Sequence, residues 1–172
     1  MANTYNLISS VTVGGGGAAD IEFTSIPATY TDLVVLASLR GTTSAVSVSG
    51  QLRFNGSTSG YGLKYLTGSG ASASSGDFSA TTSLIYLGDI PAATGTTSTF
   101  ANVLVYVPNY AGSNNKSISV DGVEERNNAA AYATLVAAKW DNASAITSVK
   151  LYPSSGNWVQ YSTARLYGIK NS

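Results

Sequence analysis

The sequence predicts an all-β protein, an antiparallel jelly-roll-like β-sandwich of about ten strands. Apolar side chains recur at every second position in several short segments, as in strands with one face on a core. Clusters of Gly, Ser, Thr, Asn and Pro separate these segments at spacings typical of all-β domains. Helical segments do not alternate with the strands, and this combination favours a sandwich or barrel. We expect a single jelly-roll-like domain over residues 1–172.

Eleven segments are predicted as strands, and one or two of them are expected to be loops or to merge. In chain order they are 4–13, 19–26, 32–40, 50–55, 60–67, 82–90, 99–107, 116–124, 130–140, 146–152 and 157–170. Four of the segments rest on strict alternation of apolar and polar residues. The alternating apolar residues are Ile21 and Phe23, Leu52 and Phe54, Tyr61, Leu63 and Tyr65, and Ile118 and Val120.

Two stretches, 33–39 and 100–107, are apolar on both faces. Strands that are buried on both sides have this pattern. In an antiparallel sandwich one face of each sheet ordinarily meets water. We therefore expect either another sheet or another copy of the chain to cover the second face, and we take the pattern as a sign of an oligomer.

Two segments are less regular. The alanines of 129–140 favour a helix, but Tyr132, Val136 and Trp140 fall on one face at period two, and we predict a strand. The segment 67–79 is rich in Ser and Gly and has almost nothing to bury, so we predict a mobile loop there.

Charge and missing residue types exclude several function classes. The chain has 9 Lys+Arg and 9 Asp+Glu, and this balance disfavours nucleic-acid binding, which needs a basic stripe. It has no Cys and no His, so disulfides, zinc sites of the usual kinds and His-based triads are absent. Residues 1–10 lack the features of a signal peptide, and the apolar stretch 33–37 is too short to span a membrane.

The carboxylates do not predict a catalytic or metal site. Asp20 and Glu22 lie on one face of one strand, where solvated charges are common. Asp121, Glu124 and Glu125 are oxygen ligands of the type that Ca²⁺ accepts, but their spacing matches no EF-hand loop. We expect a protein that is not an enzyme and that has neither a metal nor a cofactor.

Aromatic residues near strand ends are the candidate binding residues. Tyrosine and tryptophan are common at subunit interfaces and on sugar-binding surfaces, because each offers an apolar face and a polar tip. The candidates are Tyr61, Tyr65, Tyr110, Tyr152, Trp158 and Tyr161. Most of them are expected in the core or at a subunit interface, and some could stack on glycan rings. We expect the face that carries Trp158 and Tyr161 to contribute to subunit packing.

An ordered set of segments carries a family resemblance. They are 5–13, 21–27, 30–33, 52–56, 107–110, Trp140, 145–149 and 161–169. Their order over nearly the whole chain resembles a family of tailed-phage virion proteins that includes capsid decoration (cement) proteins, head fibres and C-terminal domains of tail fibres or spikes. Family members often have an acidic residue after the Asn55-Gly56 pair, where this chain has Ser57, and any cation-related role of that loop is in doubt.

The resemblance implies a jelly-roll-like domain in a homotrimer similar to tumour-necrosis-factor-type trimers, and it supplies no catalytic residues. It implies a virion protein that binds the major capsid protein or other virion proteins and is made in the host cytoplasm without a signal peptide. A domain that fills a chain starting at Met1 favours a decoration protein over a tail fibre. The alternative is a tail-fibre or tailspike adhesin that recognises host glycans, and a third possibility is a free carbohydrate-binding module.

Overall fold

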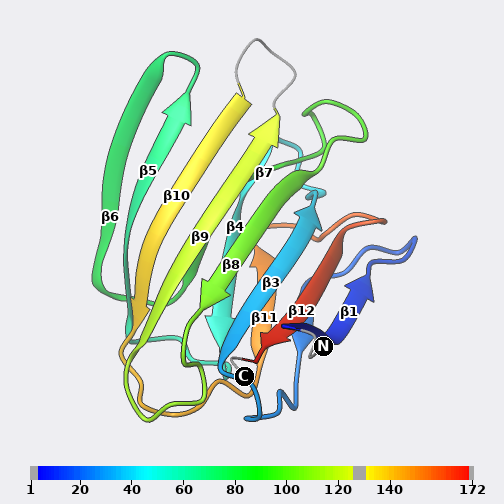
Figure 1. The fold of residues 1–172 in the computed structure, drawn as a ribbon. Coiled ribbons are helices and arrows are strands. Elements are labelled where there is room, and N and C mark those ends of the chain that lie inside the picture. The colour runs from blue at the N-terminus through cyan, green and yellow to red at the C-terminus, as the bar shows by residue number, and fades with distance from the viewer. Residues whose placement is uncertain (1–3, 126–130, 171–172) are drawn as a thin grey trace.

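The computed structural model describes residues 4–125 and 131–170. It confirms the predicted fold class, since the described residues form an all-β, jelly-roll-like sandwich without helices (Figure 1). The described residues contain twelve strands. They are β1 (Tyr5–Thr12), β2 (Ile21–Phe23), β3 (Asp32–Leu39), β4 (Ser47–Phe54), β5 (Tyr61–Ser69), β6 (Ser72–Thr82), β7 (Ile85–Pro91), β8 (Ala101–Val107), β9 (Lys116–Glu125), β10 (Ala131–Trp140), β11 (Val149–Pro153) and β12 (Thr163–Ile169).

The strands form two antiparallel sheets that pack face to face. The larger sheet has the order β1-β12-β3-β8-β9-β10-β5-β6, and the smaller one has the order β2-β11-β4-β7. Successive strands are neighbours for β5–β6, β8–β9 and β9–β10, and elsewhere the chain crosses between the sheets. Figure 1 shows the larger sheet in front of the smaller one, with β6 and β1 at its two edges. Within the described residues no helix has the length and apolarity needed to cross a membrane.

The core lies between the sheets and is filled by the inward-facing residues that the alternation predicted. Tyr61 and Trp140 stack with ring centroids 5.9 Å apart, and Phe54 packs 5.6 Å from Trp140. The Tyr61 hydroxyl accepts a hydrogen bond from the Phe54 N–H at 2.8 Å and donates one to the Phe54 carbonyl at 3.3 Å. This polar atom is therefore satisfied in an apolar site, as burial requires.

Gly122 sets how closely the sheets approach at β7 and β9. A β-carbon at this position would lie 2.9 Å from the carbonyl oxygen of Leu87 on β7. The missing side chain lets the backbone of the smaller sheet rest directly on the larger one.

Residues 67–79 are the main correction to the predicted elements. Instead of a mobile loop, they form the end of β5 and most of β6, a hairpin that turns at Gly70 with φ of +57°. Their Ser, Ala and Gly side chains give no apolar contrast, so period two is invisible in the sequence. The strand is held by its backbone pairing with β5, which runs from Ser69 opposite Ser72 to Leu63 opposite Phe78.

The other strands are confirmed with shifted ends. The ambiguous segment 129–140 is strand β10 over its described part, and the segments at 19–26 and 146–152 shorten to β2 and β11. The last strand begins at Thr163 rather than at 157. Before it, Trp158 joins Ala18 and Gly41 through isolated bridges only.

Candidate functional site

A row of leucines crosses the outer face of the larger sheet. The strand register places Leu66 opposite Leu135 and Leu104 opposite Leu36, with Asp121 of β9 between Leu135 and Leu104. We call these five residues the leucine row. Five strands spaced about 4.8 Å apart make the row about 19 Å long. The exposed fractions are 59% for Leu66, 54% for Leu135, 39% for Leu104 and 38% for Leu36.

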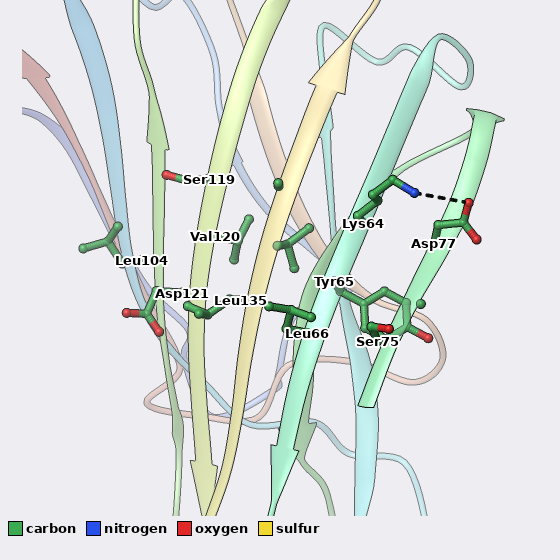
Figure 2. Close-up of a pocket in the computed structure, with 13 residues that line it drawn as sticks. Lys64, Tyr65, Leu66, Ser75, Asp77, Leu104, Ser119, Val120, Asp121 and Leu135 are labelled. Carbon is green, nitrogen blue, oxygen red and sulfur yellow. Dashed lines mark ion pairs between the residues drawn. The ribbon is translucent and has the colours of Figure 1, made fainter. Parts of the chain in front are cut away.

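All members of the row except Leu36 line a hollow of about 880 Å³, which we call the outer hollow. The hollow is deep because, in the next row of paired residues along the strands, the small residues Ala137 and Ser119 stand between longer side chains. The Lys64 ammonium and the Asp77 carboxylate approach to 3.9 Å at one border (Figure 2). Most of the other lining residues are apolar, and Asp121 is a second carboxylate among them.

The outer face of the larger sheet includes the second apolar face of the two stretches, 33–39 and 100–107, that are apolar on both sides. Among the described residues, the smaller sheet covers the inner face of β3 and β8, and no third sheet covers the outer face. Leu36 and Leu104 therefore stay in contact with water in a single chain. Contiguous exposed apolar surface on a soluble protein is typical of an interaction site.

A second exposed apolar patch lies at the far edge of the same sheet. Tyr5 and Leu7 of β1 are 57% and 56% exposed. Leu7 pairs with Tyr167 of β12, whose ring meets the Tyr5 ring edge-on at 6.2 Å. We call Tyr5 and Leu7 the β1 patch.

Three of the predicted binding residues are buried inside the protomer. Tyr61, Tyr110 and Trp158 are each 0% exposed, so they offer no surface to a glycan or to a second copy. The Tyr110 hydroxyl donates to the Pro27 carbonyl, and the Trp158 indole N–H donates to the Leu151 carbonyl at 3.1 Å. Burial raises the pKa of Tyr61 and of Tyr110. These three residues are core residues, so Trp158 itself does not supply the subunit packing expected of the face that carries Trp158 and Tyr161.

The other three candidates lie apart from one another. Tyr161 is 68% exposed and has φ of +71°, in the connection before β12. Tyr152 lies on the outer side of the smaller sheet beneath the Arg53 guanidinium, 4.8 Å from its ring centre, and burial raises its pKa. Tyr65 packs against Phe78 on β6. The structure therefore does not gather the six aromatic residues into one site.

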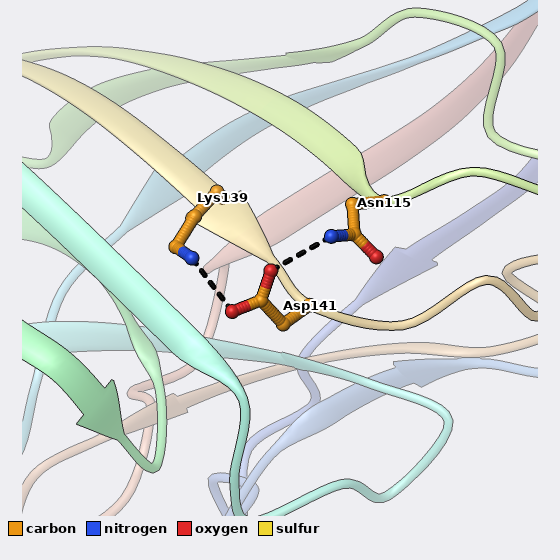
Figure 3. Close-up of polar contacts among 3 residues, drawn as sticks. All are labelled: Asn115, Lys139 and Asp141. Atoms are coloured by element: carbon orange, nitrogen blue, oxygen red, sulfur yellow. Dashed lines mark hydrogen bonds and ion pairs between the residues drawn. The ribbon is translucent and has the colours of Figure 1, made fainter.

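The charged groups at strand ends hold loops together. The Lys139 ammonium lies 2.6 Å from one oxygen of Asp141, and the Asn115 amide donates to the other at 2.8 Å (Figure 3). The buried ammonium of Lys116 donates to the Gly112 carbonyl at 2.8 Å and to two further carbonyl oxygens of these loops. Desolvation lowers the pKa of Lys116.

Two carboxylates at the start of β2, those of Asp20 and Glu22, form ion pairs with Lys150 of β11. Lys150 lies 3.2 Å from Glu22 and 3.4 Å from Asp20, and the hydrogen bond to Glu22 is the main cause that raises the pKa of Lys150. In the described ranges no group of three acidic, His or Cys side chains is placed to hold a metal ion.

Comparison of the chain with protein-family models, curated proteins and solved structures gave no match. Interpretation of function therefore depends on the leucine row, the outer hollow and the β1 patch.

Proposed function

We propose that this protein is a non-enzymatic phage virion protein, a homotrimer that decorates the capsid and strengthens its shell. The observation that carries the proposal is the four leucines of the leucine row, exposed apolar side chains in register across the outer face of the larger sheet. Such a surface is suited to lasting contact with another protein surface. The resemblance of the ordered segments to tailed-phage virion proteins supplies the biological setting.

The two apolar patches suit a closed ring. In a cyclic trimer each copy uses two different surfaces, one for each neighbour. The leucine row and the β1 patch are two such surfaces on one sheet. The exposed parts of the four leucines equal about two whole side chains. Burying them contributes about 3–6 kcal/mol to the free energy of association. Association itself costs several kcal/mol, so the row needs additional contacts, which the β1 patch can supply.

A trimer would bind the shell at several points at once. Each contact with the major capsid protein, or with another virion protein, can be modest because the three copies act together. The added binding free energy opposes the outward pressure of packaged DNA. With 10% charged residues and a net charge of +0, docking depends on apolar and uncharged polar contacts. We expect no role for nucleic acid or membrane binding.

Cosedimentation with capsid shells that lack the protein tests the proposal. We expect the purified protein to pellet with the shells and to stay bound when the salt concentration is raised, because screening weakens only charge contacts. Bound shells should resist heat better than bare shells. Failure to bind shells, or release of the protein at high salt, would contradict the proposed docking.

The second candidate function is a tail-fibre or tailspike domain that recognises host glycans. Aromatic rings beside uncharged polar side chains favour it, and a small cleft lined in this way lies at β6 and β7. Adsorption of the purified protein to host cells, without binding to shells, would favour this function over capsid decoration.

A further inference from the structure

A small cleft lies where the edges of the two sheets meet. Its volume is about 300 Å³, and Tyr65 of β5 lines both this cleft and the outer hollow. Three rings line it, those of Tyr65, Phe78 and Tyr86. Uncharged polar side chains complete the wall, among them Ser49, Gln51 and Thr82. We call this the aromatic cleft.

Strand register positions the two walls. Gln51 on β4 is paired with Tyr86 on β7, so the amide and the ring lie side by side. Across the cleft, Tyr65 on β5 is paired with Gly76 on β6. A β-carbon at Gly76 would come closer than 3.0 Å to three atoms of the Tyr65 side chain. Glycine at this position therefore lets the Tyr65 ring lie across β6.

The three rings hold one another in fixed orientations. Tyr65 and Tyr86 meet edge-on at 5.7 Å, and Phe78 lies 5.8 Å from Tyr65 and 6.3 Å from Tyr86. The Tyr86 hydroxyl donates to Asp89 at 2.9 Å, which fixes that ring further. Phe78 remains 44% exposed, so part of its ring is available to a ligand. A pre-oriented site loses little entropy when a ligand binds.

The lining specifies a class of ligand. A pyranose ring has apolar C–H faces that stack on aromatic rings and hydroxyl groups that bond to amides and hydroxyls. The cleft offers both kinds of contact, and its lining residues carry no formal charge. Its volume is at the lower end of the range for ligand sites, so it admits one ring of a longer chain.

We propose that the aromatic cleft binds one neutral saccharide unit, stacked on Phe78 and hydrogen-bonded by Gln51. This site goes beyond capsid decoration, because it would attach the particle to a glycan through side chains that are not part of the leucine row. It needs no contact with the shell, so loss of shell binding leaves it unaffected.

Saturation-transfer NMR on the full chain tests the site. The probes are methyl glycosides of neutral hexoses and of N-acetylhexosamines at millimolar concentration. We expect transfer to at least one of them, and binding weakened about tenfold by Phe78→Ser, which removes the stacking surface. Gly76→Ala should weaken binding by moving the Tyr65 ring. Tyr161→Ser, at an exposed tyrosine elsewhere, is the matched control and should bind as the wild type does.

Two results would overturn the assignment. One is the absence of transfer to every glycoside from the wild-type protein. The other is equal binding by the wild type and Phe78→Ser, with thermal melting showing that the variant is folded. If Phe78→Ser instead dissociates an oligomer and no glycoside binds, the cleft receives a side chain of a second copy, and the saccharide proposal fails.

Discussion

Replacing the two most exposed leucines of the leucine row should weaken the association of the copies and leave the folding of each copy nearly unchanged. Leu66 and Leu135 are opposite each other on β5 and β10 and are 59% and 54% exposed. Leu66→Ser with Leu135→Ser removes apolar surface that the core does not use. We expect the free energy of unfolding of the single chain to change by less than about 1 kcal/mol.

The effect on association should be much larger. The exposed parts of the two side chains together equal about one whole leucine, so covering them contributes about 1.5–3 kcal/mol to each contact. Losing that contribution raises the dissociation constant about 10- to 150-fold.

Sedimentation velocity over a dilution series measures the dissociation constant directly. Val46→Ser is the matched control, because Val46 is 46% exposed but precedes β4 of the smaller sheet. It should assemble as the wild type does. If the double variant and the control have the same dissociation constant as the wild type, the leucine row is not the contact surface and the reasoning fails.

Three further predictions concern stability. Gly76→Ala should lower the free energy of unfolding by about 1–3 kcal/mol, because the added methyl group overpacks against the Tyr65 ring. Gly68→Ala is the control and should be neutral or stabilising, because a β-carbon there meets nothing within 4 Å. Equal melting temperatures of the two variants would contradict this. Arg40 donates to four backbone carbonyl oxygens between residues 92 and 99, so Arg40→Leu should lose about 3 kcal/mol or more in urea unfolding, and a loss under about 1 kcal/mol would show that the bonds are dispensable. Burial raises the pKa of Tyr61 above 10.0, and three other tyrosines also have raised pKa values, so the unfolded chain loses these protons first and stability falls above about pH 10. Lys116 has a lowered pKa and so acts in the opposite direction, but it is a single group. Urea unfolding at about pH 8 and about pH 11 should therefore show a net fall in the free energy of unfolding at the higher pH, and Tyr61→Phe should reduce that fall. A net rise in the free energy of unfolding would refute the account.

The sequence predicts strands where apolar and polar residues contrast. β10 could be predicted despite its alanines, because Val136 and Trp140 share the inner face at period two. β6 could not, because its Ser, Ala and Gly side chains look alike on both faces. Backbone pairing with β5 defines that strand, and pairing between distant segments leaves little trace in composition.

The candidate surface could be predicted in part. The two-faced apolar pattern of 33–39 and 100–107 signals Leu36 and Leu104, which are exposed on the outer face. Leu66 and Leu135 look like single apolar residues on polar strand faces. They join the row only through the register of β5, β10, β9 and β8, which local sequence does not specify.

Residue type alone did not predict which aromatic residues are accessible. Trp158 and Tyr161 are close in sequence, but the first is 0% exposed and the second 68%. The difference arises because Trp158 is bridged to Ala18 and Gly41 from other parts of the chain. Such contacts depend on the complete fold and are not encoded in the adjacent residues.

Electron cryomicroscopy of the intact particle tests the central claim most directly. The account predicts three copies around an axis on the outer surface of the shell, with Leu66 and Leu135 covered by protein. Density for this chain on the tail alone, or an outer sheet face left open to solvent in the assembled particle, would contradict it.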